Sequence, residues 1–159
     1  MPVEVYLRTS YPDLDREYRD GDVLERTLPD YLHGKTQMLL LLFFGALRQS
    51  LSIFPCSEVR MKLREGLYLI PDVAVFHTME PSQIPDTPPL IVIEILSPDD
   101  RLTQVRDKLD AFQKWGVAHV WLVDPHGRHL YNYKSGLQEV DVLNVPELAV
   151  KLGPKDTFE

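Results

Sequence analysis

From Leu90 to Ser97 the chain reads L-I-V-I-E-I-L-S, an apolar run with a single carboxylate, Glu94, near its middle. Because side chains alternate between the two faces of a strand, this pattern predicts a strand that is apolar on both faces, with Glu94 on the same face as Val92. Such a strand normally lies inside a covered sheet. A buried ionised carboxylate is costly unless it is paired, bound to a metal or protonated, so partners for Glu94 are expected elsewhere in the chain.

The remaining pattern predicts two helices and several further strands. Residues 31–51 carry good helix formers, and the unbroken apolar run 39–44 predicts a helix surrounded by protein, ended by Phe54-Pro55. A second helix is expected from the start signal at Ser97-Pro98 to about Gly116. The expected strands cover residues 23–26, 57–64, 67–70, 73–76, 120–123 and 129–133, with a possible edge strand over 140–145. This order predicts a mixed α/β (α+β) fold with a central mixed β-sheet flanked by helices.

Length, charge and cysteine content narrow the class of protein. A chain of 159 residues, 44% apolar, predicts a single domain over residues 1–159 with its core at about 20–135. The net charge of −7 argues against a broad basic surface for nucleic acid but leaves room for a local basic cleft. The longest apolar run, 38–47, is shorter than the roughly 20 residues of a membrane span, so no membrane contact is expected. One cysteine, Cys56, and no secretory signal indicate a reducing cytoplasm.

Asp72 and Glu94 are the first candidates for chemistry. Asp72 follows a proline where one predicted strand begins, and Glu94 lies within another, so the two carboxylates converge if those strands are neighbours. Oxygen ligands with open positions suit Mg²⁺ or Mn²⁺, which can polarise a phosphodiester and activate water. The plainer interpretations are a turn aspartate for Asp72 and a buried salt bridge or a subunit contact for Glu94.

Four further side chains could assist this pair. Lys108 borders the apolar stripe of the second predicted helix, where its ammonium could hold a water or a scissile phosphate. Otherwise it is an exposed helix lysine paired with a neighbouring aspartate. His33 and Gln37 share one helix face, and with Glu25 they could complete a metal shell or position water. Capping or surface positions are the plainer interpretation of these three.

Two other features allow both a structural and a functional interpretation. Arg60, Lys62 and Arg64 share one face of the predicted strand 57–64. They form either a solvated face or a track for a DNA backbone. Trp121, within the apolar segment V-W-L-V, is expected in the core or at a subunit contact.

Several motifs together resemble one known family. Pro71-Asp72, followed 22 residues later (94 − 72) by Glu94-Ile95-Leu96, is similar to the signature of the PD-(D/E)XK nucleases. The chain resembles the Uma-two family of bacterial restriction endonucleases more closely, over roughly residues 4 to 145. The segments that carry this resemblance are E-Y-R-D-G-D-V-L-E-R, P-D-Y-L-H-G-K-T-Q, P-D-V-A-V-F, P-P-L-I-V-I-E-I-L-S-P, D-K-L-D-A-F-Q-K-W-G-V and V-W-L-V-D-P.

The resemblance implies a restriction-endonuclease-like fold and a Mg²⁺-dependent (or Mn²⁺-dependent) endonuclease that hydrolyses DNA, with Asp72 and Glu94 as metal ligands. The third position of the signature, usually lysine, is Leu96 here, and Lys108 on the next helix matches the lysine that substitutes for it in this family. The alternatives are a nuclease-fold binding or structural module without turnover, and a hydrolase of RNA or nucleotides. Exposed strand edges and the V-W-L-V segment make a homodimer the expected assembly, since cutting both strands of DNA gains from two sites.

Overall fold

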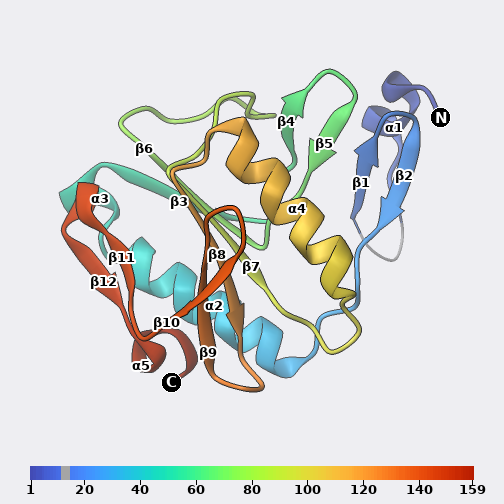
Figure 1. The fold of residues 1–159 in the computed structure, drawn as a ribbon. Coiled ribbons are helices and arrows are strands. Elements are labelled where there is room, and N and C mark those ends of the chain that lie inside the picture. The colour runs from blue at the N-terminus through green and yellow to red at the C-terminus, as the bar shows by residue number, and fades with distance from the viewer. Residues whose placement is uncertain (12–14) are drawn as a thin grey trace.

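The computed structural model describes residues 1–11 and 15–159 and is built around a six-stranded mixed sheet (Figure 1). In sheet order its strands are β10 (Leu137–Val140), β9 (His129–Tyr133), β8 (His119–Asp124), β7 (Ile91–Ile95), β6 (Val73–His77) and β3 (Ile53–Ser57). β7 pairs with β6 in antiparallel and with β8 in parallel orientation. This central position explains its apolar sequence, because both of its faces and both of its edges are covered.

The internal strand predicted from the apolar run is confirmed by β7. Every residue of this strand is buried. Ile93 packs into the hydrophobic cluster on one face of the sheet, and Val92 packs into the cluster on the other face. Glu94 alternates with Ile93 and so belongs to the face of Val92, where it is only 6% exposed.

One helix covers each face of this sheet. α2 (Tyr31–Gly45) contributes Leu40 to the cluster on the first face, and α4 (Leu102–Trp115) contributes Leu109 to the cluster on the second. In Figure 1, α4 crosses in front of the strands while α2 runs behind them. The helices and the mixed sheet confirm the predicted fold class.

A smaller four-stranded sheet stands beside α4. Its order is β2 (Asp22–Glu25), β1 (Arg16–Arg19), β5 (Leu67–Leu69) and β4 (Met61–Arg64). The turn between β1 and β2 has positive φ at Asp20 and Gly21, and the turn between β4 and β5 has a φ of 80° at Gly66, as short hairpin turns require. Pairing of β1 with β5 brings the N-terminal hairpin next to the chain that leads into β6.

Shorter elements complete the described chain. They are α1 (Val3–Arg8), α3 (Arg48–Leu51), β11 (Leu143–Val145), a 3₁₀ helix (Pro146–Leu148), β12 (Val150–Leu152) and α5 (Pro154–Phe158). The edge strand expected over 140–145 is therefore divided between β10, on the large sheet, and β11, which pairs with β12. Within the described residues, none of the helices has the length and apolar character needed to cross a membrane.

The prediction for the first helix was wrong in two respects. The helix ends at Gly45 instead of residue 51, and α3 is a separate short turn. The low helix propensity of glycine favours an end at Gly45, although Gly34 is accommodated within the same helix. The apolar run is also not surrounded by protein, because Leu42 is 61% exposed and Met38 is exposed beside it.

The strand predicted over 57–64 was also wrong. β3 ends at Ser57, β4 begins at Met61, and the two strands belong to different sheets. Glu58 lies between them with a φ of 51°, a left-handed conformation that interrupts an extended chain. β3 contains Pro55, which is tolerated because β3 is an edge strand.

The start of the second predicted helix was four to five residues too early. Ser97 precedes a turn in which its N–H donates to Asp100 Oδ2 (2.7 Å), and α4 begins only at Leu102. The acidic residue thus closes a turn instead of capping the helix. Gly116, with a φ of 113°, ends α4 as predicted. Trp121 is buried in the core, so the V-W-L-V segment is not exposed for a subunit contact.

Candidate active site

The two acidic candidates meet where β6 begins. Asp72 immediately precedes β6, and β6 pairs with β7, which carries Glu94. The backbone N–H of Asp72 donates to Glu94 Oε2 (3.1 Å), and the N–H of Ile95 donates to Asp72 Oδ2 (2.7 Å). The strand pairing itself therefore fixes the relative position of these two carboxylates, which are 5% and 6% exposed.

Lys108 reaches into this pair from α4. Its ammonium contacts Glu94 Oε1, lies 2.9 Å from Glu17 Oε2, and donates to the carbonyl oxygen of Ile70 (2.7 Å). Burial alone would lower the pKa of this lysine, but the charges of Glu17 and Glu94 outweigh burial and raise the pKa. Lys108 is thus held as a cation inside the site and does not pair with a neighbouring aspartate on the helix surface.

Glu17 is a site residue that the sequence analysis missed. It lies on β1, is buried, and accepts a hydrogen bond from the backbone N–H of Ile70 (2.7 Å) besides contacting Lys108. β1 has only four residues, R-E-Y-R, too few for a clear pattern. Only the pairing of β1 with β5 brings Glu17 to the other candidates.

Arg26 is a second residue that the sequence analysis missed. It directly follows β2, and its side chain is only 13% exposed. Nη2 lies 2.9 Å from Asp72 Oδ1, and Nη1 lies 3.0 Å from Glu58 Oε1, so the guanidinium bridges two carboxylates. In the sequence Arg26 is a cation that directly follows Glu25 at the end of the predicted strand 23–26, and nothing there identifies a partner 46 residues away.

His33 and Gln37 both reach Asp72 from α2. His33 Nε2 lies 3.3 Å from Asp72 Oδ1, and Gln37 Nε2 donates to the backbone carbonyl of Asp72 (2.8 Å). Asp30 caps the helix by accepting from the N–H of His33 (2.9 Å), which fixes the first turn that carries the imidazole. The predicted common face of His33 and Gln37 therefore points at one residue.

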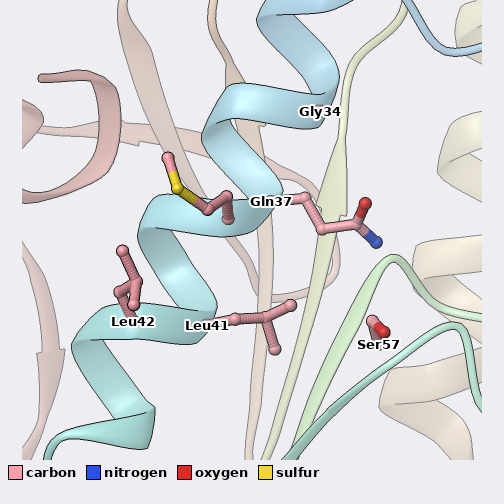
Figure 2. A pocket seen from close by; sticks show the side chains of 6 residues that line it. Gly34, Gln37, Leu41, Leu42 and Ser57 are labelled. Carbon is pink, nitrogen blue, oxygen red and sulfur yellow. The ribbon is translucent and has the colours of Figure 1, made fainter.

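Gln37 also borders a second hollow of about 340 Å³, which is lined by residues of α2 and by Ser57 of β3. Figure 2 shows its side chain extending from the helix toward the strands, above Ser57. Leu41 and Leu42 lie one turn further along the same helix. Among the described residues that line this hollow, Gln37 alone has a side-chain amide, and that amide donates to the backbone carbonyl of Asp72.

Glu25 does not join the other predicted site residues. Its carboxylate is largely exposed and lies 3.5 Å from Arg16 Nη2, at the rim of the cleft that contains the site. The side chains that contact the carboxylates of Asp72 and Glu94 include His33, Arg26 and Lys108 but not Glu25. Glu25 lies close to His33 in the sequence, but it ends β2 with its side chain exposed to solvent.

The two central carboxyl groups have opposite pKa shifts. Burial raises the pKa of Glu94 to about 8, opposed by Lys108 and reinforced by the charges of Asp72 and Glu17. Burial would also raise the pKa of Asp72, but the hydrogen bond from His33 and the charges of His33, Lys108 and Arg26 lower it. Burial therefore acts against ionisation of Glu94, while the surrounding cations favour ionisation of Asp72.

The donor set fits a hard divalent cation. Asp72 and Glu94 offer only oxygen ligands, and because burial raises the pKa of Glu94, an added cation beside it stabilises its ionised form. Among the described residues no three His, Cys, Asp or Glu side chains form a complete cage for a metal. Mg²⁺ does not need one, because it is commonly bound by one or two carboxylates together with waters and substrate phosphates.

The site lies in a cleft of about 940 Å³ between the small sheet and α4. Its described lining includes eight acidic residues and five lysines or arginines, so the cleft is acidic by itself. The acids are Glu17, Glu25, Glu58, Asp72, Glu94, Asp99, Asp100 and Asp107, and the cations are Arg16, Arg19, Arg26, Arg101 and Lys108. A polyanionic substrate in this cleft requires additional positive charge, which bound divalent ions supply.

The basic stripe predicted on 57–64 lies outside this cleft and is engaged elsewhere. Lys62 lies 3.1 Å from Glu65, and Arg64 lies 2.9 Å from Asp20. The guanidinium of Arg60 stacks over the ring of Tyr6 at 5.3 Å. These contacts favour the interpretation of the stripe as a surface face of the small sheet.

Comparisons with known proteins agree with this architecture. The model of the Uma2 family, described as "Putative restriction endonuclease", matches residues 3–155. The crystal structure of a putative nuclease from Anabaena variabilis is similar, with a TM-score of 0.86 and 23% sequence identity, and the similarity covers 99% of this chain and 97% of that one. A search of the curated proteins finds no match. The restriction-endonuclease resemblance of the sequence is thereby confirmed at the level of family and fold.

Proposed function

Because this chain belongs to the Uma2 family of putative restriction endonucleases, we propose that it is a metal-dependent endonuclease that hydrolyses DNA phosphodiester bonds. The observation that carries the proposal is the buried pair of Asp72 and Glu94, joined by the ammonium of Lys108, inside an acidic cleft. With Glu17 and Arg26, the buried network contains three carboxylates and two cations. Removing so many charges from water is costly, so such networks are seldom purely structural and are often found in catalytic sites.

Each residue of the site has a role in this proposal. Asp72 and Glu94 would hold Mg²⁺ or Mn²⁺, which when bound polarises the phosphodiester and lowers the pKa of a water molecule. Lys108 places a fixed positive charge beside Glu94, where it can stabilise negative charge that develops on the phosphate. Glu17 orients Lys108 by a second ion pair. His33 and Gln37 hold Asp72 by its carboxylate and its backbone.

Cleavage of a duplex DNA substrate in the presence of Mn²⁺ tests the proposal. The wild-type protein is expected to cleave, a chelator is expected to stop cleavage, and the variants Asp72→Ala and Glu94→Ala are expected to be inactive. Single-stranded DNA, RNA and small phosphodiesters, assayed in parallel, distinguish a DNA endonuclease from an RNA or nucleotide hydrolase. Cleavage that persists in both alanine variants would rule out the assignment.

A nuclease-fold module without turnover is the second candidate. Two observations favour it: Leu96 stands at the usual lysine position, and Arg26, His33 and Lys108 already contact the carboxylates that would bind a metal. Calorimetric titration with Mn²⁺ separates the candidates. Binding that is lost in Asp72→Asn supports the enzyme, and no binding supports the module.

The homodimer and the cytoplasmic location remain proposals. The V-W-L-V segment no longer supports a subunit contact, because Trp121 is buried within the chain's own core. The argument that remains is functional: two copies of the site could cut both strands of a duplex. Mass measurement in solution tests the dimer. A reducing compartment is proposed on the single cysteine, Cys56.

A further inference from the structure

Arg26 places its positive charge beside Asp72, where the proposed metal ion would bind. Its Nη2 lies 2.9 Å from Asp72 Oδ1, and its side chain is almost completely enclosed. The charges of Asp72 and Glu94 raise its pKa against the opposing effect of burial, so Arg26 carries a full positive charge there. A divalent ion approaching Asp72 meets this charge at short range.

The hydrogen bonds and ion pairs of Asp72 show which groups an ion bound to Oδ1 would replace. Oδ1 contacts both Arg26 Nη2 (2.9 Å) and His33 Nε2 (3.3 Å), while Oδ2 accepts from the N–H of Ile95 (2.7 Å). A carboxylate offers about four lone-pair sites, two on each oxygen. Three of these sites are engaged, two of them on Oδ1, so a metal that binds Asp72 through Oδ1, alone or together with Oδ2, displaces Arg26 or His33.

Glu58 gives Arg26 a second anchor that allows such a movement. Nη1 of Arg26 lies 3.0 Å from Glu58 Oε1, on the connection between β3 and β4. Glu58 is exposed and lies at the side of the cleft. Since the guanidinium is a rigid fork with donors on separate nitrogens, Nη2 can leave Asp72 while Nη1 stays on Glu58. The released Nη2 then faces the cleft, where a phosphate oxygen is its natural partner.

We propose that Arg26 competes with the divalent ion for Asp72 and, once displaced but still held by Glu58, binds the phosphodiester substrate. The inference rests on the proposed function, since it requires a metal at Asp72. Arg26 is in this sense a positioning residue for the metal-free site and a substrate-binding residue for the loaded site. The competition sets a minimum metal concentration for activity.

Titration of the metal-free full-length protein with Mn²⁺, followed by calorimetry, tests the competition. Arg26→Met is expected to bind Mn²⁺ about tenfold more tightly than the wild type, because the nearby positive charge is gone. The matched control is Arg101→Met, which removes a cation from the same cleft that does not contact Asp72 and is expected to change the affinity less than about twofold. Asp72→Asn verifies that the measured binding is at this site.

Glu58→Gln provides an independent variant, because Glu58 is exposed and its substitution is compatible with folding. With the second anchor neutralised, Arg26 remains on Asp72, and Mn²⁺ is expected to bind about threefold more weakly. Affinity in Arg26→Met no tighter than in Arg101→Met would overturn the inference. If Arg26→Met does not fold, an unchanged or tighter affinity in Glu58→Gln overturns it.

Cleavage assays on the same variants separate this inference from the proposed function. Arg26→Met is expected to bind Mn²⁺ more tightly yet to have a higher KM for duplex DNA, a combination that a purely structural role does not produce. Tighter Mn²⁺ binding in Arg26→Met with no cleavage by the wild type would refute the nuclease function and leave the competition intact. Cleavage by the wild type with no tightening in Arg26→Met would refute only the competition.

Discussion

Two lysines of α4 form ion pairs of similar length in very different surroundings. Lys108 is 17% exposed and lies 2.9 Å from Glu17 Oε2, while Lys114 is 79% exposed and lies 2.7 Å from Asp110 Oδ2. Both occur in one segment, D-K-L-D-A-F-Q-K, in which Lys108 directly follows Asp107 and Lys114 lies four residues after Asp110. Distance therefore does not distinguish the two pairs, and the exposure of each lysine does.

The surroundings decide what each lysine can do. Water and mobile ions screen the pair of Lys114 with Asp110, so its effect on stability is small. Lys108 has exchanged its hydration for contacts with Glu17, Glu94 and the carbonyl of Ile70. Removing it leaves buried charges without a partner, which costs far more than the pair itself contributes. The same enclosure makes its charge effective on a reacting phosphate.

The largest difference between the two lysines is expected in catalysis. Lys108→Met should lower kcat/KM for DNA cleavage by about a thousandfold, in the range seen when one electrostatic stabiliser is removed from an enzyme site. Lys114→Met should cleave as the wild type does. Both variants are assayed at a temperature where circular dichroism shows them folded. Equal activities of the two variants would contradict a role of Lys108 in the chemistry.

A second difference is expected in stability. Lys108→Met should lower the free energy of unfolding by about 3–5 kcal/mol, since one partner of a buried network is lost. Urea denaturation followed by fluorescence measures this change. The control, Lys114→Met, should leave the midpoint within the scatter of repeated measurements. A comparable loss in the control would show that α4 propensity, and not the buried network, dominates.

The pH dependence of the free energy of unfolding tests the comparison at Glu94, the partner of Lys108. The pKa of Glu94 is raised by burial from 4.5 to about 8. The folded state therefore holds a proton that the unfolded state has lost, and stability falls as pH rises from about 4.5 to about 8. In metal-free buffer the wild type should lose up to about 1.4 kcal/mol per pH unit relative to Glu94→Gln. Urea denaturation of both proteins at pH 5, 6, 7 and 8 checks the slope, and parallel curves would contradict it.

The smallest effect is expected at the partner of Lys114. Asp110→Asn removes an exposed ion pair and should shift the urea midpoint only at low ionic strength. Denaturation in 20 mM and in 500 mM salt should show any difference from the wild type disappearing at the higher concentration. A difference that persists would mean that the hydrogen bond from Tyr133 to Asp110 Oδ1 (3.2 Å), and not the ion pair, matters at this end of the helix.

Local regularity explains which elements were predictable. The apolar run around Glu94 identifies β7, because burial on both faces requires apolar residues at almost every position of the strand. The break at Glu58 has no corresponding sequence pattern. Its left-handed φ of 51° arises because β3 and β4, on either side of it, belong to different sheets. The exposed side of α2 is equally hidden, since Leu42 looks the same in the sequence whether or not another element covers it.

The site residues also divide into those that the sequence could suggest and those that it could not. Asp72, Glu94, Lys108 and His33 could be proposed because each interrupts or borders a pattern, and the structure places them together. Glu17 and Arg26 lie on a short hairpin without periodicity, so only the contact of that hairpin with the rest of the fold reveals them. Glu25 was included on proximity in sequence alone, and it points to solvent.

The sequence alone determined the fold class, the family and the strand that carries a carboxylate into the core, because periodicity and local motifs are written in consecutive residues. Tertiary structure decided which charges surround that carboxylate. Arg26 approaches Asp72 from 46 residues away, and Glu17 approaches Ile70 from 53 residues away. Electrostatic interactions act through space and depend on burial, so neither the partners nor their strength can be obtained from spacing along the chain.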